Sequence, residues 1–368
     1  MSKKIILTGG GSAGHVTPNI ALLPGLRERG FEIHYVGQAD GIEHRLITEQ
    51  GDVIFHSIEA GKLRRYFSLK NLTDPFKVLK GISEAKRIIK EVKPDLVFSK
   101  GGFVSVPVVM AAKGKCPVLC HESDFTPGLA NKLAAKYADR VLVTFDDTLQ
   151  YVGKKGIHTG TPIRRELFSG SRVRGLDFLG FSGDKPIILV MGGSLGASAL
   201  NDAIRASLDT ITARYDVVHL CGKDKVDESI NIPSYRQYEY IGPELPDILA
   251  ATAVIVSRAG ANALFEFLSL NKPTLLVPLP KGASRGDQLL NAAYAAKKGY
   301  SMTLLQEDIT PERLVHDINE LYENRDEFIT RMKKDSTLDG TDEVLECIDE
   351  ITGDNRYPHD KASITHFY

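Results

Sequence analysis

The chain has 368 residues, of which 42% are hydrophobic and 25% are charged, and its formal net charge is -1. This composition is typical of a soluble globular protein, and the length is enough for about two domains with full cores. A nearly neutral chain argues against general nucleic-acid binding. No apolar run approaches the roughly 18 residues of a membrane span, and Met1 leads almost directly into an apolar run, so we expect a cytoplasmic protein without a signal peptide.

The first apolar run is followed by a glycine-rich stretch, TGGGSAGH at residues 8–15. Glycines allow positive φ angles and a close approach of the backbone to a ligand. The apolar spacing that follows predicts a helix ending at Gly30, so the turn would lie at a helix N-terminus and offer unpaired amides to a phosphate or pyrophosphate. His15, at its edge, is a candidate catalytic group or, alternatively, only a capping or packing residue. The glycine spacing also matches the dinucleotide-binding fingerprint, whereas no GK[ST] follows, which excludes a P-loop.

Short β-branched runs then alternate with helix-length segments, which predicts βαβ units and parallel sheets with helices on both faces. A stretch rich in Gly, Thr and Pro at 156–164 marks a boundary, after which an apolar run at 187–191 again meets a glycine turn. We therefore predict an α/β protein with two Rossmann-like domains, 1–163 and 164–352, facing a ligand-binding cleft, and a tail at 353–368. The predicted strands are 4–7, 33–37, 53–58, 96–99, 118–120, 141–145, 187–191, 217–220, 237–241, 254–257, 274–277 and 302–305.

Polar groups near the turns of the second half suggest a nucleotide-sugar site. The turn GGSLGAS, 192–198, offers amides and the Ser194 hydroxyl to a pyrophosphate, or is only a tight strand-to-helix turn. In SRAGANALFE, Glu266 falls two turns into a helix, where a carboxylate accepts hydrogen bonds from a ribose diol; the alternative is a solvated glutamate. Gln288 suits sugar hydroxyls, while Asp287 before it is alternatively an N-cap.

The first half carries a second polar group in CHESDFTPG, residues 120–128. His121, Glu122 and Asp124 follow a strand end, where a parallel sheet presents its ligands, although one or two of them would serve equally to satisfy loop amides. The chain contains no Asp-x-Asp, CxxC or HxxxH spacing, so we expect neither a metal nor another cofactor. A diphosphate leaving group would then be neutralised by helix N-termini and by Arg164 at the domain boundary.

Residues 62–93 combine basic and apolar side chains, with ten Lys or Arg against three acids. At helical spacing these residues form two apolar stripes. One stripe suffices for a core, and the other, ringed by lysines, would suit an anionic membrane surface. The alternative is a single wide core face with a solvated rim. The first stripe is Val78, Ile82, Ala85 and Ile89, and the second is Leu72, Phe76 and Leu79.

Taken in order, these motifs resemble the MurG family of peptidoglycan glycosyltransferases across nearly the whole chain. The motifs are GGGSAGH, KGGFVSVP, HESD with TPGLANK, TPIR, GGSLGA, SRAGANALFE and RGDQLLNA, and the GKLRRYFSLKN and HESD variants resemble the low-GC Gram-positive branch. The resemblance implies a glycosyltransferase B fold with inverting, metal-independent chemistry. It also implies transfer of N-acetylglucosamine from UDP-N-acetylglucosamine to undecaprenyl-pyrophosphoryl-N-acetylmuramoyl-pentapeptide (lipid I), giving lipid II, by a peripheral protein at the cytoplasmic face of the cell membrane.

The same resemblance assigns roles by position. Glu266 would bind the ribose hydroxyls, the backbone of Ile241 would read uracil, and Gln288 would hold the sugar hydroxyls. His15 would be the base that deprotonates the muramoyl 4-hydroxyl, with His121, Glu122 or Asp124 on the acceptor side as alternatives. Leu72, Phe76 and Leu79 would form the membrane patch. The implied donor-side set is Ser12, Ala13, Gly14, Arg164, Ser194, Ile241, Gly260, Glu266 and Gln288, of which Ser194 and Arg164 would face the diphosphate.

Two departures from the family pattern stand out. Ser12-Ala13-Gly14 replaces a common Thr-Gly-Gly, which keeps the hydroxyl, and Ser123-Asp124 replaces Gln-Asn, which puts the role of Asp124 in question. Rival functions on such a fold are a UDP-N-acetylglucosamine 2-epimerase and a transferase to another lipid, such as diacylglycerol. A nicotinamide-dependent oxidoreductase fits poorly, because a second glycine turn opens the other domain and Glu266 lies in that half.

Overall fold

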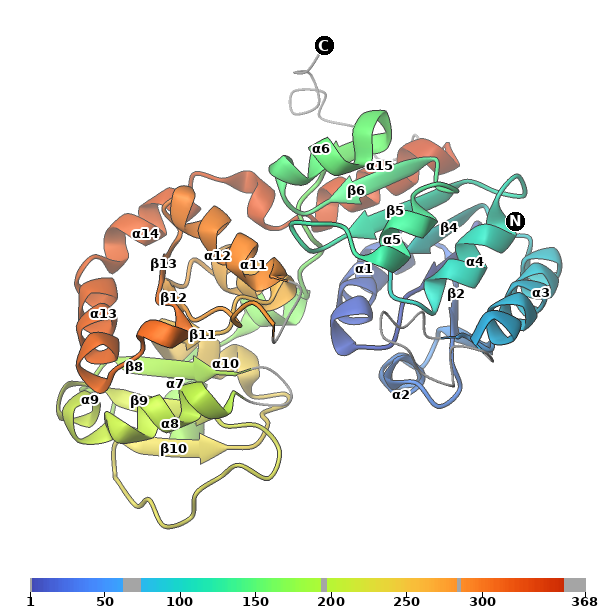
Figure 1. The fold of residues 1–368 in the computed structure, drawn as a ribbon. Helices are drawn as coiled ribbons and strands as arrows, with labels where there is room; N and C mark the ends of the chain where they lie inside the picture. The colour runs from blue at the N-terminus through green and yellow to red at the C-terminus, as the bar shows by residue number, and fades with distance from the viewer. Residues whose placement is uncertain (1, 62–73, 193–196, 283–285, 354–368) are drawn as a thin grey trace. The chain divides into compact units, whose positions relative to one another are not determined.

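The computed structural model describes residues 2–61, 74–192, 197–282 and 286–353. It divides the chain into two compact units, shown in Figure 1. Unit 1 holds Met1–Pro162 and the chain from Asp339 onward, and unit 2 is Ile163–Leu338. Each unit contains one parallel sheet with helices on both faces, which confirms the predicted fold class.

The sheet of unit 1 has the strand order β3-β2-β1-β4-β5-β6-β7. Most of its side chains are buried on both faces, which explains why the strands read as continuous apolar runs rather than as alternating ones. The short β7 lies within the stretch that we interpreted as a boundary. The strands are β1 Lys4–Thr8, β2 Glu32–Gly37, β3 Ile54–Ser57, β4 Leu96–Ser99, β5 Val118–Glu122, β6 Arg140–Val143 and β7 Gly156–His158.

Helices cover both faces of this sheet. Ala85, Ile88 and Val92 of α3 join one core, and Leu22 and Leu26 of α1 join the core on the other face. The helical elements are η1 Ala13–His15, α1 Thr17–Glu28, α2 Ile42–Thr48, α3 Asp74–Val92, α4 Ser105–Ala112, α5 Leu129–Ala134, η3 Asp146–Thr148, α6 Leu149–Val152 and η4 Gly153–Lys155.

The final helix, α15 (Thr341–Thr352), belongs to unit 1 and not to unit 2. Leu345 packs into the core beside α1, where a Cβ on Gly25 would lie 2.3 Å from the Leu345 Cδ1 atom. The buried Asp349 carboxylate accepts hydrogen bonds from Arg29 Nε at 2.8 and 3.0 Å. The structure therefore places α15 with unit 1, whereas we had predicted that the second domain runs to residue 352. The predicted tail, 353–368, lies outside the described residues except for Gly353. An apolar helix face does not reveal which sheet it covers.

Unit 2 repeats the architecture with the strand order β10-β9-β8-β11-β12-β13. Its strands lie close to the predicted ranges, except that β10 begins earlier and ends at Tyr238, which leaves Ile241 in the following connection. The strands are β8 Ile187–Met191, β9 Asp216–Leu220, β10 Tyr235–Tyr238, β11 Thr252–Ser257, β12 Thr274–Leu276 and β13 Ser301–Thr303. The helical elements are η5 Arg165–Ser169, α7 Arg172–Leu179, α8 Ser198–Ala206, α9 Leu208–Arg214, α10 Leu245–Ala251, α11 Ala261–Ser269, α12 Asp287–Lys297, η6 Gln306–Asp308, α13 Pro311–Glu323, α14 Arg325–Met332 and η7 Ser336–Leu338.

Each sheet reverses its winding direction at one place. In unit 1 the chain runs from β1 through β2 to β3, and then returns to the other side of β1 with β4. In unit 2 the same reversal places β11 beside β8. Ligands of open parallel sheets bind outside the carboxyl ends of the strands at such switch points, so we expect ligands at the turns after β1, β4, β8 and β11.

Candidate functional site

In unit 2, two predicted site residues contact each other. Arg164 Nε and Nη2 lie 3.1 and 3.0 Å from Glu266 Oε1. Burial raises the pKa of Glu266, and the neighbouring Arg164 charge opposes that increase. Within the described part of unit 2, both guanidinium contacts go to Oε1, so Oε2 is the oxygen available to accept hydrogen bonds from a diol.

A hydrogen bond joins α12 to the turn that precedes α11. Asn291 Nδ2 on α12 donates to the Ala259 carbonyl at 3.0 Å, which ties α12 to the turn after β11. Leu279 N–H donates to Gln288 Oε1 at 3.0 Å, so the Nε2 group of Gln288 remains as the donor for a ligand. Among the described residues, a Cβ added to Gly260, at the N-cap of α11, would meet nothing within 4 Å.

Arg258, which was not among the predicted site residues, stabilises the carboxyl end of the unit 2 sheet. The buried guanidinium donates to the Val277 carbonyl at 3.0 Å and to Gln306 Oε1 at 2.6 Å, and burial lowers its pKa. Its position directly after β11 was the available signal. Ile241 is buried next to Tyr240, whose side chain is 80% exposed, and Ser194 lies outside the described residues.

In unit 1, the glycine turn after β1 differs from its prediction in two ways. A short 3-10 turn, η1, separates it from α1, which begins only at Thr17. The amide of Gly11 is not unpaired, because it donates to Glu43 Oε2 at 3.2 Å. Ser12 is exposed, and Ala13, Gly14 and His15 are half-buried in η1, so the predicted site residues of this turn do face accessible space.

Glu43 is a second residue that the sequence analysis missed. Its carboxylate is fully buried and also accepts the Gln38 N–H at 3.1 Å. A Cβ on Gly10, Gly37 or Gly41 would lie 2.5, 2.7 or 2.4 Å from the Glu43 side chain. Any residue other than glycine at these three positions would therefore clash with the Glu43 side chain. The Glu43 carboxylate in turn holds the glycine turn in place by accepting the Gly11 N–H. The two glycines shortly before Glu43, Gly37 and Gly41, were the signal in the sequence.

The turns after β1 and β4 and the end of β5 lie on adjacent strands. A Cβ on Gly102 would lie 2.9 Å from His15 Cδ2, so His15 rests against the turn after β4. Lys100 in that turn is buried and contacts the predicted acceptor residue His121 at 2.9 Å. The segments that carry His15 and His121 thus lie at the same edge of the sheet, and both contact the turn after β4. Lys100, which makes the contact to His121, was not among the predicted site residues.

Glu122 satisfies loop amides, as the alternative interpretation held. Its buried carboxylate accepts hydrogen bonds from Asp124 N at 2.9 Å, Gly128 N at 3.1 Å and Asn131 Nδ2 at 2.8 Å. Burial raises the pKa of Glu122, and the charge of Asp124 adds to that increase. Asp124 itself is half-buried in the loop after β5.

The helix α3 presents two faces. Residues of its C-terminal half, including Ala85, Ile88 and Val92, lie in the core of unit 1, whereas Phe76 and Leu79 are 74% and 64% exposed. The alternative prediction, that both apolar stripes belong to a single wide core face, is therefore wrong for Phe76 and Leu79. Leu72 lies outside the described residues. None of the helices that the structure describes is both long and apolar enough to cross a membrane.

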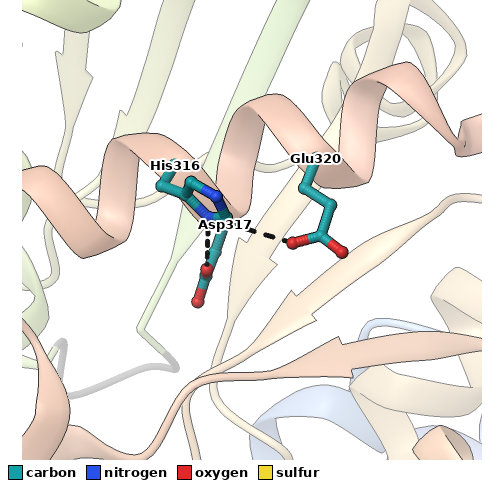
Figure 2. Close-up of side chains that lie close together, drawn as sticks. All are labelled: His316, Asp317 and Glu320. Carbon is teal, nitrogen blue, oxygen red and sulfur yellow. Dashed lines mark hydrogen bonds and ion pairs between the residues drawn. The ribbon is translucent and has the colours of Figure 1, made fainter.

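One group of possible metal ligands occurs in the described chain, on α13. Figure 2 shows His316 Nδ1 close to Asp317, at 3.2 Å from Oδ1, with Glu320 one turn further along the helix. Asp317 also accepts hydrogen bonds from Arg313 Nε at 2.8 and 3.0 Å. Because this guanidinium already neutralises the carboxylate, and His316 and Glu320 are exposed, the group is an ordinary set of helix ion pairs.

Two parallel α/β units with polar turns at their switch points, one of them carrying the Arg164–Glu266 pair, are typical of the class of two-domain glycosyltransferases. Residues 5–143 match the glycosyltransferase family 28 N-terminal domain, and residues 187–346 match the family's C-terminal domain. The chain belongs to glycosyltransferase family 28.

The relatives are close in sequence. A Clostridium tetani protein is 53% identical over 353 residues, which cover 95% of this chain and 98% of that protein; it is named UDP-N-acetylglucosamine--N-acetylmuramyl-(pentapeptide) pyrophosphoryl-undecaprenol N-acetylglucosamine transferase. A Lachnoclostridium phytofermentans protein of the same name is 52% identical, with 95% and 99% covered. The crystal structure of Acinetobacter baumannii MurG matches with a TM-score of 0.73 at 26% identity, covering 95% of this chain and 99% of that one. A UDP-N-acetylglucosamine 2-epimerase shares the fold, with a TM-score of 0.67 at 15% identity and 98% and 99% covered.

Proposed function

We propose that this glycosyltransferase moves N-acetylglucosamine from UDP-N-acetylglucosamine to undecaprenyl-pyrophosphoryl-N-acetylmuramoyl-pentapeptide, lipid I, and so forms lipid II. The observation that carries the proposal is the 52–53% identity, over 95% of the chain, to enzymes named for this transfer. The Arg164–Glu266 pair of unit 2 supports it, because a carboxylate and a guanidinium are groups that a nucleotide sugar requires.

The donor is held by unit 2 in this proposal. Glu266 Oε2 accepts the ribose hydroxyls, and the Nε2 group of Gln288 donates to hydroxyls of the sugar. Arg164 and the N-terminus of α11 at Gly260 face the diphosphate, whose charge they neutralise without a metal. The buried backbone at Ile241 reads the uracil ring, and Ser194 contributes its hydroxyl to the diphosphate.

The reaction is a single displacement. The muramoyl 4-hydroxyl oxygen attacks the anomeric carbon from the face opposite UDP, the new C–O bond forms as the bond to the UDP oxygen breaks, and the configuration inverts from α to β. His15 accepts the hydroxyl proton. The hydrogen bonds of His121 and Glu122 favour His15 over these two alternatives, because both nitrogens of His121 and both carboxylate oxygens of Glu122 are already engaged.

The acceptor is reached at a membrane surface. Phe76 and Leu79 project from α3 beside the exposed Lys77 and Lys80, a combination suited to the anionic lipid of the cytoplasmic leaflet. Leu72 extends the same stripe in the sequence. The protein is accordingly proposed to be peripheral, at the cytoplasmic face of the cell membrane.

One assay tests the proposal against its rivals. Labelled UDP-N-acetylglucosamine is incubated with the protein alone, with a lipid I analogue, and with diacylglycerol. We expect label in the lipid fraction only with the lipid I analogue. Label on diacylglycerol would indicate a different lipid transferase, and UDP-N-acetylmannosamine formed without lipid would indicate the epimerase; either result contradicts the proposal.

A further inference from the structure

Lys100 is a buried charge between two loops of unit 1. Its side chain is 1% exposed, directly after β4. The ammonium donates to His121 Nδ1 at 2.9 Å and also contacts the Ser123 hydroxyl. Neither the donor contacts nor the general base of the proposed mechanism involves this lysine.

The two contacts of His121 determine its protonation. Nε2 lies 2.8 Å from the Gly160 carbonyl oxygen, which can only accept, so Nε2 carries a hydrogen. Nδ1 then holds the lone pair that accepts from Lys100. Burial and the Lys100 charge both lower the pKa of His121 well below its ordinary value, in agreement with a neutral ring. The imidazole therefore has no nitrogen left to remove a proton from a substrate.

A buried ammonium is costly unless opposite charges and acceptors surround it. Lys100 is stabilised by the charges of Glu122 and Asp124, which oppose the lowering of its pKa by burial. Glu122 Oε1 in turn accepts the Asp124 N–H at 2.9 Å. The lysine thus connects the end of β4 with the end of β5 and with the loop that carries Asp124.

We propose that Lys100 is a positioning residue of the acceptor site: its ammonium holds His121 as the neutral Nε2–H tautomer and fixes the Ser123–Asp124 segment that receives the acceptor. The inference rests on the proposed function, since it names the residue that orders the acceptor side of that reaction. Lys100 acts through its neighbours and does not contact the reacting atoms.

The test combines kinetics with NMR. Lys100→Met removes the charge at nearly constant length, and we expect KM for the lipid I analogue to rise about 10- to 100-fold while KM for UDP-N-acetylglucosamine stays unchanged. Lys155→Met is the matched control, because Lys155 is also a structural lysine of unit 1, with its Nζ donating to the carbonyls of Ala135 and Ala138 at 3.3 and 2.6 Å. If Lys100→Met does not fold, Lys100→Arg replaces it, with the same split expected because the charge is displaced.

Imidazole 15N spectra of the full-length protein provide a readout that does not depend on turnover, with His121→Gln to assign the resonance. We expect a neutral Nε2–H pattern for His121 in the wild type. In Lys100→Met the Gly160 carbonyl still accepts from Nε2, but Nδ1 has lost the ammonium beside it, so we expect the ring to become an imidazolium at a higher pH than in the wild type. An Nδ1–H or imidazolium His121 in the wild type, or an acceptor KM equal to that of Lys155→Met, would overturn the inference. A wild type that shows the expected tautomer but transfers no sugar would instead refute the proposed function.

Discussion

Replacing Glu266 by Gln should weaken donor binding with little effect on folding. The substitution keeps the shape but removes the charge that would accept the ribose hydroxyls. A hydrogen bond to a charged group is worth about 1.5–3 kcal/mol, so the loss of one such bond should raise Kd for UDP by about 10- to 150-fold. Arg164 would lose its ion-pair partner, but its side chain is one-quarter exposed, so water compensates and the stability cost should stay small.

The assay is calorimetric titration with UDP, together with KM for UDP-N-acetylglucosamine. Glu312→Gln is the control, because this substitution makes the same chemical change at an exposed residue of α13 in the same unit. In the proposed site the ribose hydroxyls bind the ionised Glu266 carboxylate, and burial raises the pKa of this group. UDP affinity of the wild type should therefore fall as pH falls through that raised pKa, while Glu266→Gln should show no such loss. An unchanged Kd in Glu266→Gln would refute the ribose assignment.

Four further predictions follow from other parts of the molecule. His15→Ala should lower kcat by about two to four orders of magnitude, whereas a change confined to KM in steady-state assays would assign the base elsewhere. The double variant Phe76→Ser, Leu79→Ser should reduce sedimentation with anionic vesicles while leaving transfer to a water-soluble acceptor intact; unaltered sedimentation would contradict the membrane patch. Leu345→Ala should destabilise unit 1 by about 2–5 kcal/mol in urea unfolding, because it opens a cavity against α1, and an effect on unit 2 alone would contradict the placement of α15. Burial lowers the pKa of Lys272 from 10.5 to about 8, so the unfolded state binds more protons than the folded state between these two pH values. The free energy of unfolding of the wild type should therefore rise with pH across this window relative to Lys272→Met, by at most about 3.5 kcal/mol at roughly 1.4 kcal/mol per pKa unit. Equal pH dependences of the two proteins in urea unfolding would contradict this prediction.

The sheets were largely predictable from the sequence, because buried parallel strands appear as continuous apolar runs and their turns are marked by glycine. The place of α15 was not predictable. Its apolar positions identify a helix with one buried face, but its partners on α1 lie about 320 residues away in the chain. Only the packing of Leu345 and the Arg29–Asp349 pair determine which sheet it covers.

The sequence allowed individual site residues to be predicted, but not the contacts between them. Glu266 and Arg164 were each assigned to the donor, yet their ion pair joins positions 102 residues apart. Lys100 and Glu43 were missed because a buried charge is recognised by its surroundings, and a lysine or glutamate in a sequence is more often exposed. His121 and Glu122 were predicted as alternative bases. Their hydrogen bonds, which the sequence does not reveal, indicate a structural role for both.

In the proposed function, unit 2 holds a nucleotide sugar at the switch point between β8 and β11. Crystals soaked with UDP-N-acetylglucosamine provide the direct test. We expect density for the ribose at Glu266 Oε2 and for the sugar hydroxyls at Gln288 Nε2. A donor bound in full occupancy away from both side chains would contradict it.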